Sequence, residues 1–412
     1  MHETIRAELP CNLFGSAEAT VIARKGRSGA PLRTVACRGC GLVRSDPRPH
    51  DARRFYSEDY RLEYKGSFVP RPKHVLRAGR VALSRLALIR PLLRPGLRIL
   101  DVGSGGGEFA YLLSRLGHRV EGVEPNRGYA EFSRREYGLQ VHRGFIDEVV
   151  LAHGSYDLIT IWHVLEYTEN PAGVLRQLQQ ALAPEGVLVV EVPNVEGPRR
   201  SASSTFHEAH LYNFNEATLS AIGAGAGLLP QSVTPSADRG NLVAVFRQDP
   251  ALQQAAACPL ALAANHDRVA ASVLGHRPLA YWTSARPYAR IAHHLWRPLT
   301  EAAALCRPLG ARERLDRLYA EVSGTTRPGK RWLPRFGTIA AFYLAAIAIE
   351  WLLLDLILEP RGWTAWESFW VFNVLLLATA ATAALVLRKR PRSRLVGWVT
   401  AMTPLAALPL LC

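Results

Sequence analysis

One stretch of the chain, residues 97–116, sets the strongest limit on its fold. It reads "LRILDVGSGGGEFAYLLSRL": an apolar run ends at Asp101, four glycines follow within six residues, and the rest has helical spacing. This order predicts a buried strand, a tight turn and a helix. Glycine permits left-handed backbone and close approach of a ligand, and the N–H groups that open the helix are free to bind a polar group. The stretch is either a ligand-binding turn or an ordinary glycine-rich connection.

The motifs around this stretch favour the ligand-binding interpretation. Gly103 and Gly105 begin like a dinucleotide fingerprint, but Glu108 stands at the place of its third glycine. The pattern D-x-G-x-G-x-G resembles instead motif I of the class I S-adenosylmethionine (SAM) methyltransferases. Further segments follow in that family's order, namely "HRVEGVEP", "LQVHRGFIDEV", "YDLITIWHVLEYTENP" and "GVLVVEVPN".

The resemblance implies an α/β fold, a seven-stranded Rossmann-like SAM methyltransferase sheet, with SAM as cofactor. It assigns the methionine part to Asp101 and the glycine loop, the ribose to the loop that begins at Glu124, the adenine to the end of the third strand, and the methyl group to the end of the fourth. The implied cofactor-binding residues are Asp101, Gly103, Ser104, Gly105, Gly107, Glu124, Pro125, Asn126, Phe145, Ile146, Asp147 and Trp162.

Three histidines are candidates for the catalytic base. His163 follows the fourth strand in a match to the family's "HVLEH" pattern, and it either shapes the site or acts on the acceptor. His207 and His210 stand in "FHEAHLYNF", which opens the stretch of residues 206–228 that is expected to form the helix after the fifth strand. Imidazole suits proton removal near neutral pH. In the related sugar C-methyltransferases this element contains a His–Tyr pair, but Asn213 stands at the place of that tyrosine and Tyr212 is one position away. A purely structural role is the alternative for each histidine.

The N-terminal segment resembles a small zinc-binding module that precedes many bacterial SAM methyltransferases. That module supplies two cysteine pairs, and here Cys37 and Cys40 form one pair while Cys11 is followed by Phe14 at the partner position. Structural zinc is nearly always four-coordinate. Either Cys11, Cys37 and Cys40 still bind zinc, with His50 weighed as a fourth ligand, or the module has lost its metal and packs with apolar side chains.

Charge and apolar runs indicate a membrane partner. The formal net charge is +15, with 50 Lys and Arg against 35 Asp and Glu, spread without a dense basic run, so anionic lipid is expected rather than nucleic acid. Residues 336–358, 369–387 and 395–412 are apolar and long enough to span a bilayer. Basic clusters at 327–335 and 388–394 predict that both of these loops, and the catalytic domain, face the cytosol at the cytoplasmic membrane.

The expected organisation has five parts. They are a degenerate zinc-ribbon-like module at 1–66, a helical cover at 67–96, the SAM-binding domain at 97–247, a helical Pro- and Arg-rich region at 248–335, and three transmembrane helices at 336–412. The predicted function is a membrane-anchored SAM-dependent methyltransferase for a small, lipid-soluble or lipid-linked acceptor, by O- or C-methylation. The alternatives are a methyltransferase for a nucleotide- or glycan-linked sugar, and a non-catalytic SAM-binding membrane scaffold.

Overall fold

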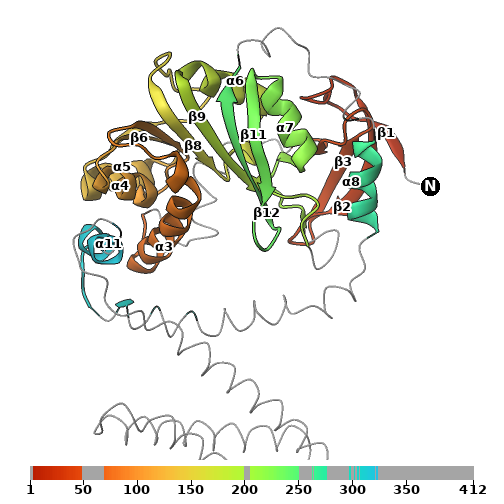
Figure 1. Cartoon of the computed structure of the whole chain (residues 1–412). Helices are drawn as coiled ribbons and strands as arrows, with labels where there is room; N and C mark the ends of the chain where they lie inside the picture. The colour runs from red at the N-terminus through yellow and green to blue at the C-terminus, as the bar shows by residue number, and fades with distance from the viewer. Residues whose placement is uncertain are drawn as a thin grey trace, which may run out of the picture. The chain divides into compact units, whose positions relative to one another are not determined.

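A computed structural model of the chain describes two sheets and the helices that pack on them (Figure 1). The described residues are 3–48, 69–198, 205–249, 264–275 and 307–320, together with positions 262, 297, 301, 304, 305 and 322. The three predicted membrane spans lie outside these residues. No helix in the described part of the chain is both long and apolar enough to cross a bilayer.

The larger sheet has seven strands in the order β11-β12-β9-β8-β5-β6-β7. The five strands from β9 to β7 are parallel, and β12 and β11 continue the sheet in antiparallel pairing. This is the seven-stranded α/β arrangement that the sequence predicts. The strands are β5 (Arg98–Val102), β6 (Arg119–Glu124), β7 (Gln140–Arg143), β8 (Tyr156–Trp162), β9 (Leu182–Pro193), β11 (Leu228–Pro235) and β12 (Asn241–Gln248).

Helices cover both faces of this sheet, because alternate residues of its central strands are buried on opposite sides. On one face Ile99 and Leu158 pack with α3, α4, α5 and α11, and on the other face Leu100 and Ile159 pack with α6 and α7. The helices are α3 (Pro72–Ile89), followed by the short η2 (Arg90–Leu92), α4 (Glu108–Arg115), α5 (Arg127–Tyr137), α6 (Pro171–Ala181), α7 (Glu216–Ala224) and α11 (Ala311–Tyr319), with η3 (Leu165–Tyr167) after β8.

The smaller sheet belongs to the N-terminal module, but its last strand does not. Its order is β1-β2-β3-β4-β10, and every pairing is antiparallel. The strands are β1 (Thr4–Arg6), β2 (Glu18–Lys25), β3 (Pro31–Cys37), β4 (Val43–Ser45) and β10 (Tyr212–Asn213). Tyr212 pairs with Arg44 and Asn213 pairs with Val43. The methyltransferase part of the chain therefore supplies the edge strand of the module's sheet.

The pairing of β10 with β4 corrects one expectation from the sequence. The stretch from Phe206 to Leu228 was expected to open with a helix, but α7 begins only at Glu216, where the Asn215 side chain caps it by accepting a hydrogen bond from the backbone of Thr218. Before this cap the chain is held in extended conformation by β4. Tertiary pairing therefore overrides the local helical spacing.

One hydrophobic core runs through both sheets. Leu42 of the module is fully buried in the same cluster as Leu211 and Phe214 beside β10, and this cluster continues to Leu100 and Ile159 of the larger sheet. Helix α8 (Asn265–Leu274) contacts β2 and β3 of the module (Figure 1). The Asn265 side chain donates to the carbonyl of Cys40 at 2.8 Å. The predicted boundary near residue 66 therefore does not separate two cores.

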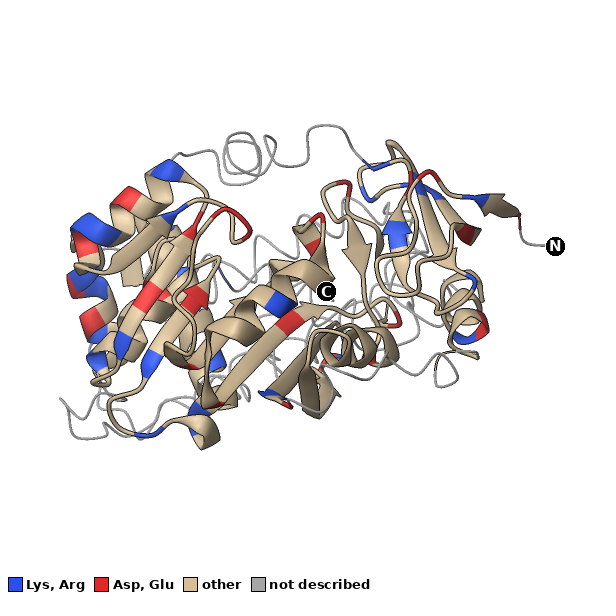
Figure 2. Ribbon diagram, turned by 90° about the horizontal axis from the view of Figure 1, so that it is seen from above, with Lys and Arg blue, Asp and Glu red and all other residues tan. Residues whose placement is uncertain are grey.

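Charged side chains are interspersed along the described helices and strands (Figure 2). Several form surface ion pairs, such as Arg98 with Asp157 and Arg127 with Glu131. Such exposed pairs contribute little to stability, because water and salt screen the two charges. The charges that bear on function are the buried ones at the carboxyl edge of the larger sheet.

Candidate active site

The glycine loop joins β5 to α4 in a strained form that glycine alone tolerates well. Gly103, Gly105 and Gly107 have φ of 72°, 58° and 88°. A Cβ atom on Gly107 would stand 2.0 Å from the Ser133 hydroxyl oxygen, so no larger side chain fits without movement. The loop thus brings bare backbone to the carboxyl edge of the sheet, where α/β proteins of this kind bind ligands.

Glu124, at the end of β6, lies directly against this loop. Its side chain is buried, with one carboxylate oxygen 2.8 Å from the backbone nitrogen of Gly105 and the other 3.0 Å from that of Asn126. Asn126 in turn caps α5 by accepting from the backbone of Tyr129 at 3.1 Å. The carboxylate is therefore fixed between β5 and β6, as a ribose-binding residue requires. Its role toward ribose stays a prediction.

A cavity of about 50 Å³ opens beside Glu124. It brings together five of the predicted residues: Gly103 of the loop, Pro125, Phe145, Ile146 and Asp147. The strand expected to reach Ile146 ends at Arg143, so the predicted adenine residues lie in the loop after β7. The full lining is Val102, Gly103, Val123, Pro125, Phe145, Ile146, Asp147, Val164, Tyr167, Thr168 and Glu169.

The far wall of the cavity was not predicted from the sequence. Tyr167, Thr168 and Glu169 follow β8, and the N-terminal module supports them from behind: Arg48 donates to the Glu169 carbonyl at 3.0 Å. The Asn12 amide adds a 3.0 Å contact to Asn170, where α6 begins. A signal for Tyr167 was present, since it stands where the family pattern "HVLEH" has its second histidine.

Asp101 is fully enclosed beneath the glycine loop. It accepts a 2.8 Å hydrogen bond from the Thr160 hydroxyl. Burial raises the pKa of Asp101 to about 6, although the positive charge of Arg85 and the hydrogen bond from Thr160 act in the opposite direction. This carboxyl group therefore changes charge just below neutral pH.

Arg85 is a site residue that the sequence analysis missed. It comes from α3, its guanidinium lies 4.8 Å from the centre of the Trp162 ring, and its Nε atom is buried with no hydrogen-bond partner in the described part of the chain. The available signal was an arginine on the apolar stripe of α3, between Ala82 and Leu86. An unfilled donor next to Asp101 suits the carboxylate of an amino-acid group, as in the methionine part of SAM.

Trp162 is the last residue of β8 and His163 follows it, but the two side chains have different surroundings. Trp162 is buried and meets Phe109 edge-on, with ring centroids 5.6 Å apart, so its ring packs in the core under α3 and α4. His163 has a φ of 55°, which is unusual for a residue with a side chain. Its imidazole lies between Glu166, at 3.2 Å, and Glu191, at 3.7 Å.

These two carboxylates decide the protonation of His163. Burial alone lowers the pKa of His163, but Glu166 and Glu191 outweigh it and raise the pKa to about 9. A protonated imidazole has no free lone pair to accept a proton. The ion pair therefore favours the shaping role that was left open for His163 over the role of catalytic base.

His210 has the opposite electrostatics. Burial, followed by the charges of His207 and His163, lowers the pKa of His210 to about 3, so its imidazole is neutral. Its Nε2 atom lies 3.0 Å from the Tyr167 hydroxyl, and its backbone carbonyl accepts from the Ser45 hydroxyl of the module at 2.9 Å. The module thus fixes His210, and Tyr167 connects it to the cavity.

The His207 side chain contacts the turn that carries His210. Its Nδ1 atom accepts from the backbone of Ala209 at 3.1 Å, and its ring stacks on that of His210 with centroids 5.0 Å apart. Burial lowers the pKa of His207. The contacts of His207 match the structural alternative better than those of His210 do.

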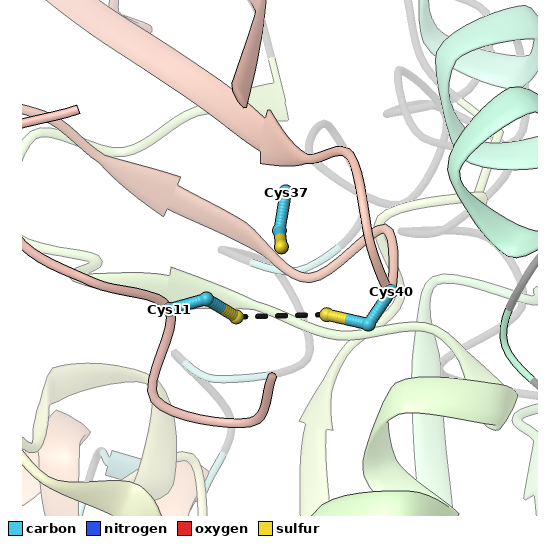
Figure 3. A group of neighbouring side chains, drawn as sticks. All are labelled: Cys11, Cys37 and Cys40. Carbon is cyan, nitrogen blue, oxygen red and sulfur yellow. Dashed lines mark hydrogen bonds between the residues drawn. The ribbon is translucent and has the colours of Figure 1, made fainter. Parts of the chain in front are cut away.

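The three predicted metal ligands come together in the module (Figure 3). The sulfur atoms of Cys11, Cys37 and Cys40 all lie within 4.8 Å of one another, and all three side chains are buried. His50 lies outside the described residues. The structure confirms the grouping of the cysteines, while metal binding stays a prediction.

Buried polar atoms at the carboxyl edge support a bound polar ligand. Ser104 Oγ and Glu166 Oε2 are enclosed and have no hydrogen-bond partner among the described residues. Together with the bare glycine loop and the fixed Glu124 carboxylate, they fit a cofactor that carries hydroxyl groups and positive charge.

Comparison with known proteins agrees with this geometry. Residues 74–232 match a methyltransferase domain family. A ubiquinone biosynthesis O-methyltransferase of Azorhizobium caulinodans is 31% identical over 136 residues, 30% of this chain and 54% of the relative. One of Nitrosococcus oceani is 38% identical over 97 residues, 22% of this chain and 41% of the relative. The chain thus spans about half the length, or less, of these relatives.

A solved structure, the S-adenosylmethionine dependent methyltransferase of Mesorhizobium loti, is 20% identical, with a TM-score of 0.36 over 40% of this chain and 98% of that one. The family match places a methyltransferase domain on the glycine loop and the strands around it. The family match supports the predicted enzyme class, a SAM-dependent methyltransferase, and the predicted cofactor, SAM.

Replacing Glu124 with alanine should lower SAM affinity at least about tenfold, since a hydrogen bond to a charged group is worth about 1.5–3 kcal/mol. Glu121→Ala is the matched control, because this carboxylate on the same strand bonds His142 and Tyr156 instead of the loop. Calorimetric titration of both variants with SAM checks this. Equal affinities in the two variants would contradict the ribose assignment.

SAM affinity should also fall as pH drops through about 6, because Asp101 then takes up a proton and no longer attracts a positively charged cofactor. The sign for stability is opposite: with a pKa raised from about 3.9, Asp101 stabilises the cofactor-free fold below pH 4 and this contribution is lost as pH rises through 6. Titrations from pH 5 to 8 should show the affinity change in the parent and a flatter profile in Asp101→Asn. A parallel profile in both proteins would refute the assignment.

Proposed function

We propose that this chain is a SAM-dependent O-methyltransferase that acts on the hydroxyl group of a small, lipid-soluble acceptor at a membrane. The observation that carries the proposal is the Tyr167–His210 pair, which places a neutral imidazole behind a hydroxyl in the cavity wall. The names of the relatives, ubiquinone biosynthesis O-methyltransferases, support both the O-methyl chemistry and the lipid-soluble acceptor.

The chain's residues would align the reactants and remove one proton. SAM supplies a methyl group on a positively charged sulfur, which leaves as a neutral thioether. The glycine loop, Glu124 and Asp101 would hold the cofactor, and the acceptor would lie against Tyr167 in the cavity wall. As the acceptor oxygen bonds to the methyl carbon, its proton becomes strongly acidic, so even a weak base such as neutral His210 can accept it through the Tyr167 hydroxyl.

The alternative function, methylation of a nucleotide- or glycan-linked sugar, would need a tyrosine paired with His210 in this element, and Tyr212 does not fill that place. Tyr212, the tyrosine nearest to His210 along the chain, is buried in β10, and its hydroxyl accepts from Arg48 at 3.3 Å and contacts the Glu169 carbonyl at 3.4 Å. It is therefore used to join the module to the cavity wall. The tyrosine that meets His210 is Tyr167, from another element.

The membrane part of the proposal is carried by the apolar runs at 336–358, 369–387 and 395–412 and by the basic residues beside them. An anchor would keep the catalytic domain on the cytosolic side of the cytoplasmic membrane, with anionic lipid at the basic loops. It would also keep the site close to an acceptor that partitions into lipid.

His210→Ala and Tyr167→Phe should each lower turnover about 100-fold or more, since a positioned base contributes about 10²–10⁴ in rate. The double variant should lose little more, because both residues act in one proton path. The assay is transfer of labelled methyl from SAM to lipid-soluble phenols and, in parallel, to sugar nucleotides, with SAM binding measured separately. His207→Ala is the control and should keep most of the activity.

Turnover within a few-fold of the parent in both single variants would contradict the proposed proton path. Methyl transfer to sugar nucleotides but not to phenols would contradict the lipid-soluble acceptor and favour the sugar alternative. Loss of SAM binding in His210→Ala would show that this histidine is structural.

Topology can be tested with a reporter that is active only outside the cytoplasm. Fused after Trp363, between the first two predicted spans, it should be active, and fused after Arg390, in the second basic loop, it should be silent. The reverse pattern would contradict the orientation, and a silent reporter at both positions would contradict the spans.

A further inference from the structure

Helix α11 comes from a part of the chain beyond residues 74–232, the region that matches the methyltransferase domain family. It nevertheless packs into the core formed by α3, α4 and α5, and it lies beside α3 (Figure 1). Leu315 and Tyr319 of α11 are completely buried in this core. A segment from outside the matched domain therefore contributes to the layer of helices that carries the glycine loop and Arg85.

The sequence of α3 makes room for this helix at Gly79. A Cβ atom there would stand 2.6 Å from Leu315 Cδ2 and 3.3 Å from the Tyr319 hydroxyl oxygen. Glycine in the interior of a helix lowers its stability relative to alanine, so this position favours the contact with α11 over helix propensity. The same helix presents Arg85 to the Asp101 side of the candidate site. The position of α3, and with it that of Arg85, thus depends on α11.

The last residue of α11 bonds the first residue of α4. The Tyr319 hydroxyl donates to the backbone carbonyl of Glu108 at 2.9 Å, and Glu108 directly follows Gly107 of the glycine loop. The Glu108 carboxylate is buried against the same loop, because a Cβ on Gly106 would stand 2.7 Å from one of its oxygens. Tyr319 therefore holds the turn at which the N–H groups of α4 open toward a ligand.

Further polar contacts fix α11 on its neighbours. Asp316 accepts a 2.7 Å hydrogen bond from the Tyr111 hydroxyl of α4, and Arg115 Nε lies 3.5 Å from the same carboxylate. Arg312 donates to the backbone carbonyl of Glu136, near the end of α5, at 2.9 Å. A shift of α11 would break these bonds together with the Tyr319 bond, so the helix has one well-defined position.

We propose that α11 forms part of the cofactor site, with Tyr319 as a positioning residue for the start of α4, so that docking of α11 and binding of SAM stabilise each other. Bound SAM needs the glycine loop and Arg85 in one arrangement, and α11 contacts both helices that carry them. Such a coupling is reciprocal: the factor by which docked α11 raises SAM affinity is the factor by which SAM favours docking. The proposal concerns cofactor binding and does not depend on the acceptor.

The first test is calorimetric titration of the full-length chain with SAM. Tyr319→Phe removes only the hydroxyl group and should lower SAM affinity at least about fivefold, the lower end of typical couplings between sites. Tyr137→Phe is the matched control and should bind SAM as the parent does. This buried tyrosine also packs on Tyr111, but its hydroxyl has no hydrogen-bond partner in the described part of the chain.

A second pair of variants tests the contact between α3 and α11. Gly79→Val places a side chain where Leu315 and Tyr319 now lie, so it should displace α11 and lower SAM affinity about tenfold or more. Ala87→Val adds the same side chain to an exposed position of the same helix and should leave the affinity unchanged.

Hydrogen exchange separates coupling from simple support of the fold. In the parent, saturating SAM should slow amide exchange in residues 311–319 about fivefold or more, because the bound cofactor favours docked α11. In Tyr319→Phe the same addition should have a clearly smaller effect. A residue that only stabilised the fold would change the exchange rate without changing its response to SAM.

Equal SAM affinities in Tyr319→Phe and Tyr137→Phe would overturn the proposal. Exchange in residues 311–319 that does not respond to SAM in the parent would overturn it as well, and would show that α11 supports the fold alone. Both measurements report binding or exchange, so neither depends on methyl transfer to an acceptor.

Discussion

The pairing of β10 with β4 is the contact on which the arrangement of the site depends. Only Tyr212 and Asn213 form the strand, yet it joins the sheet of the module to the segment that carries His210. Leu211 and Phe214, which flank it, are buried in the core shared with Leu42. Because a strand edge leaves unpaired backbone groups until it is covered, each part completes the other. The module is thus part of the structure that forms the candidate site.

The buried charges separate the histidines into different tasks. His163 is held between two carboxylates and keeps its proton, whereas His210 is enclosed beside other cationic groups and stays neutral. The same residue type therefore contributes a fixed positive charge at one place and a neutral imidazole at another. Near them Arg85 faces Asp101, whose pKa of about 6 makes its charge sensitive to mild acid. Environment, and not residue identity, assigns these roles.

The sequence predicts well what depends on neighbouring residues. The glycine loop, the strand before it and the Glu124 position follow from local spacing, and so do the seven strands of the sheet. The grouping of the cysteines follows from the spacing of one pair. Tyr167, Arg85 and β10 depend on contacts between segments far apart in the chain: His210 meets Tyr167 across 43 positions. The helical spacing after residue 206 predicted a helix too early, because the pairing of β10 with β4 there outweighs the local helix preference.

The contacts behind the cavity wall bear on how such a protein can change over evolutionary time. Arg48 of the module donates a hydrogen bond to the Glu169 carbonyl, and the Asn12 side-chain amide donates one to the Asn170 side chain. A gene fusion that exchanged the module for an unrelated one would leave the domain without its wall and its edge strand together. Inheritance should therefore keep the two segments as a linked pair, because a change in either one disturbs the contacts that support the cavity wall.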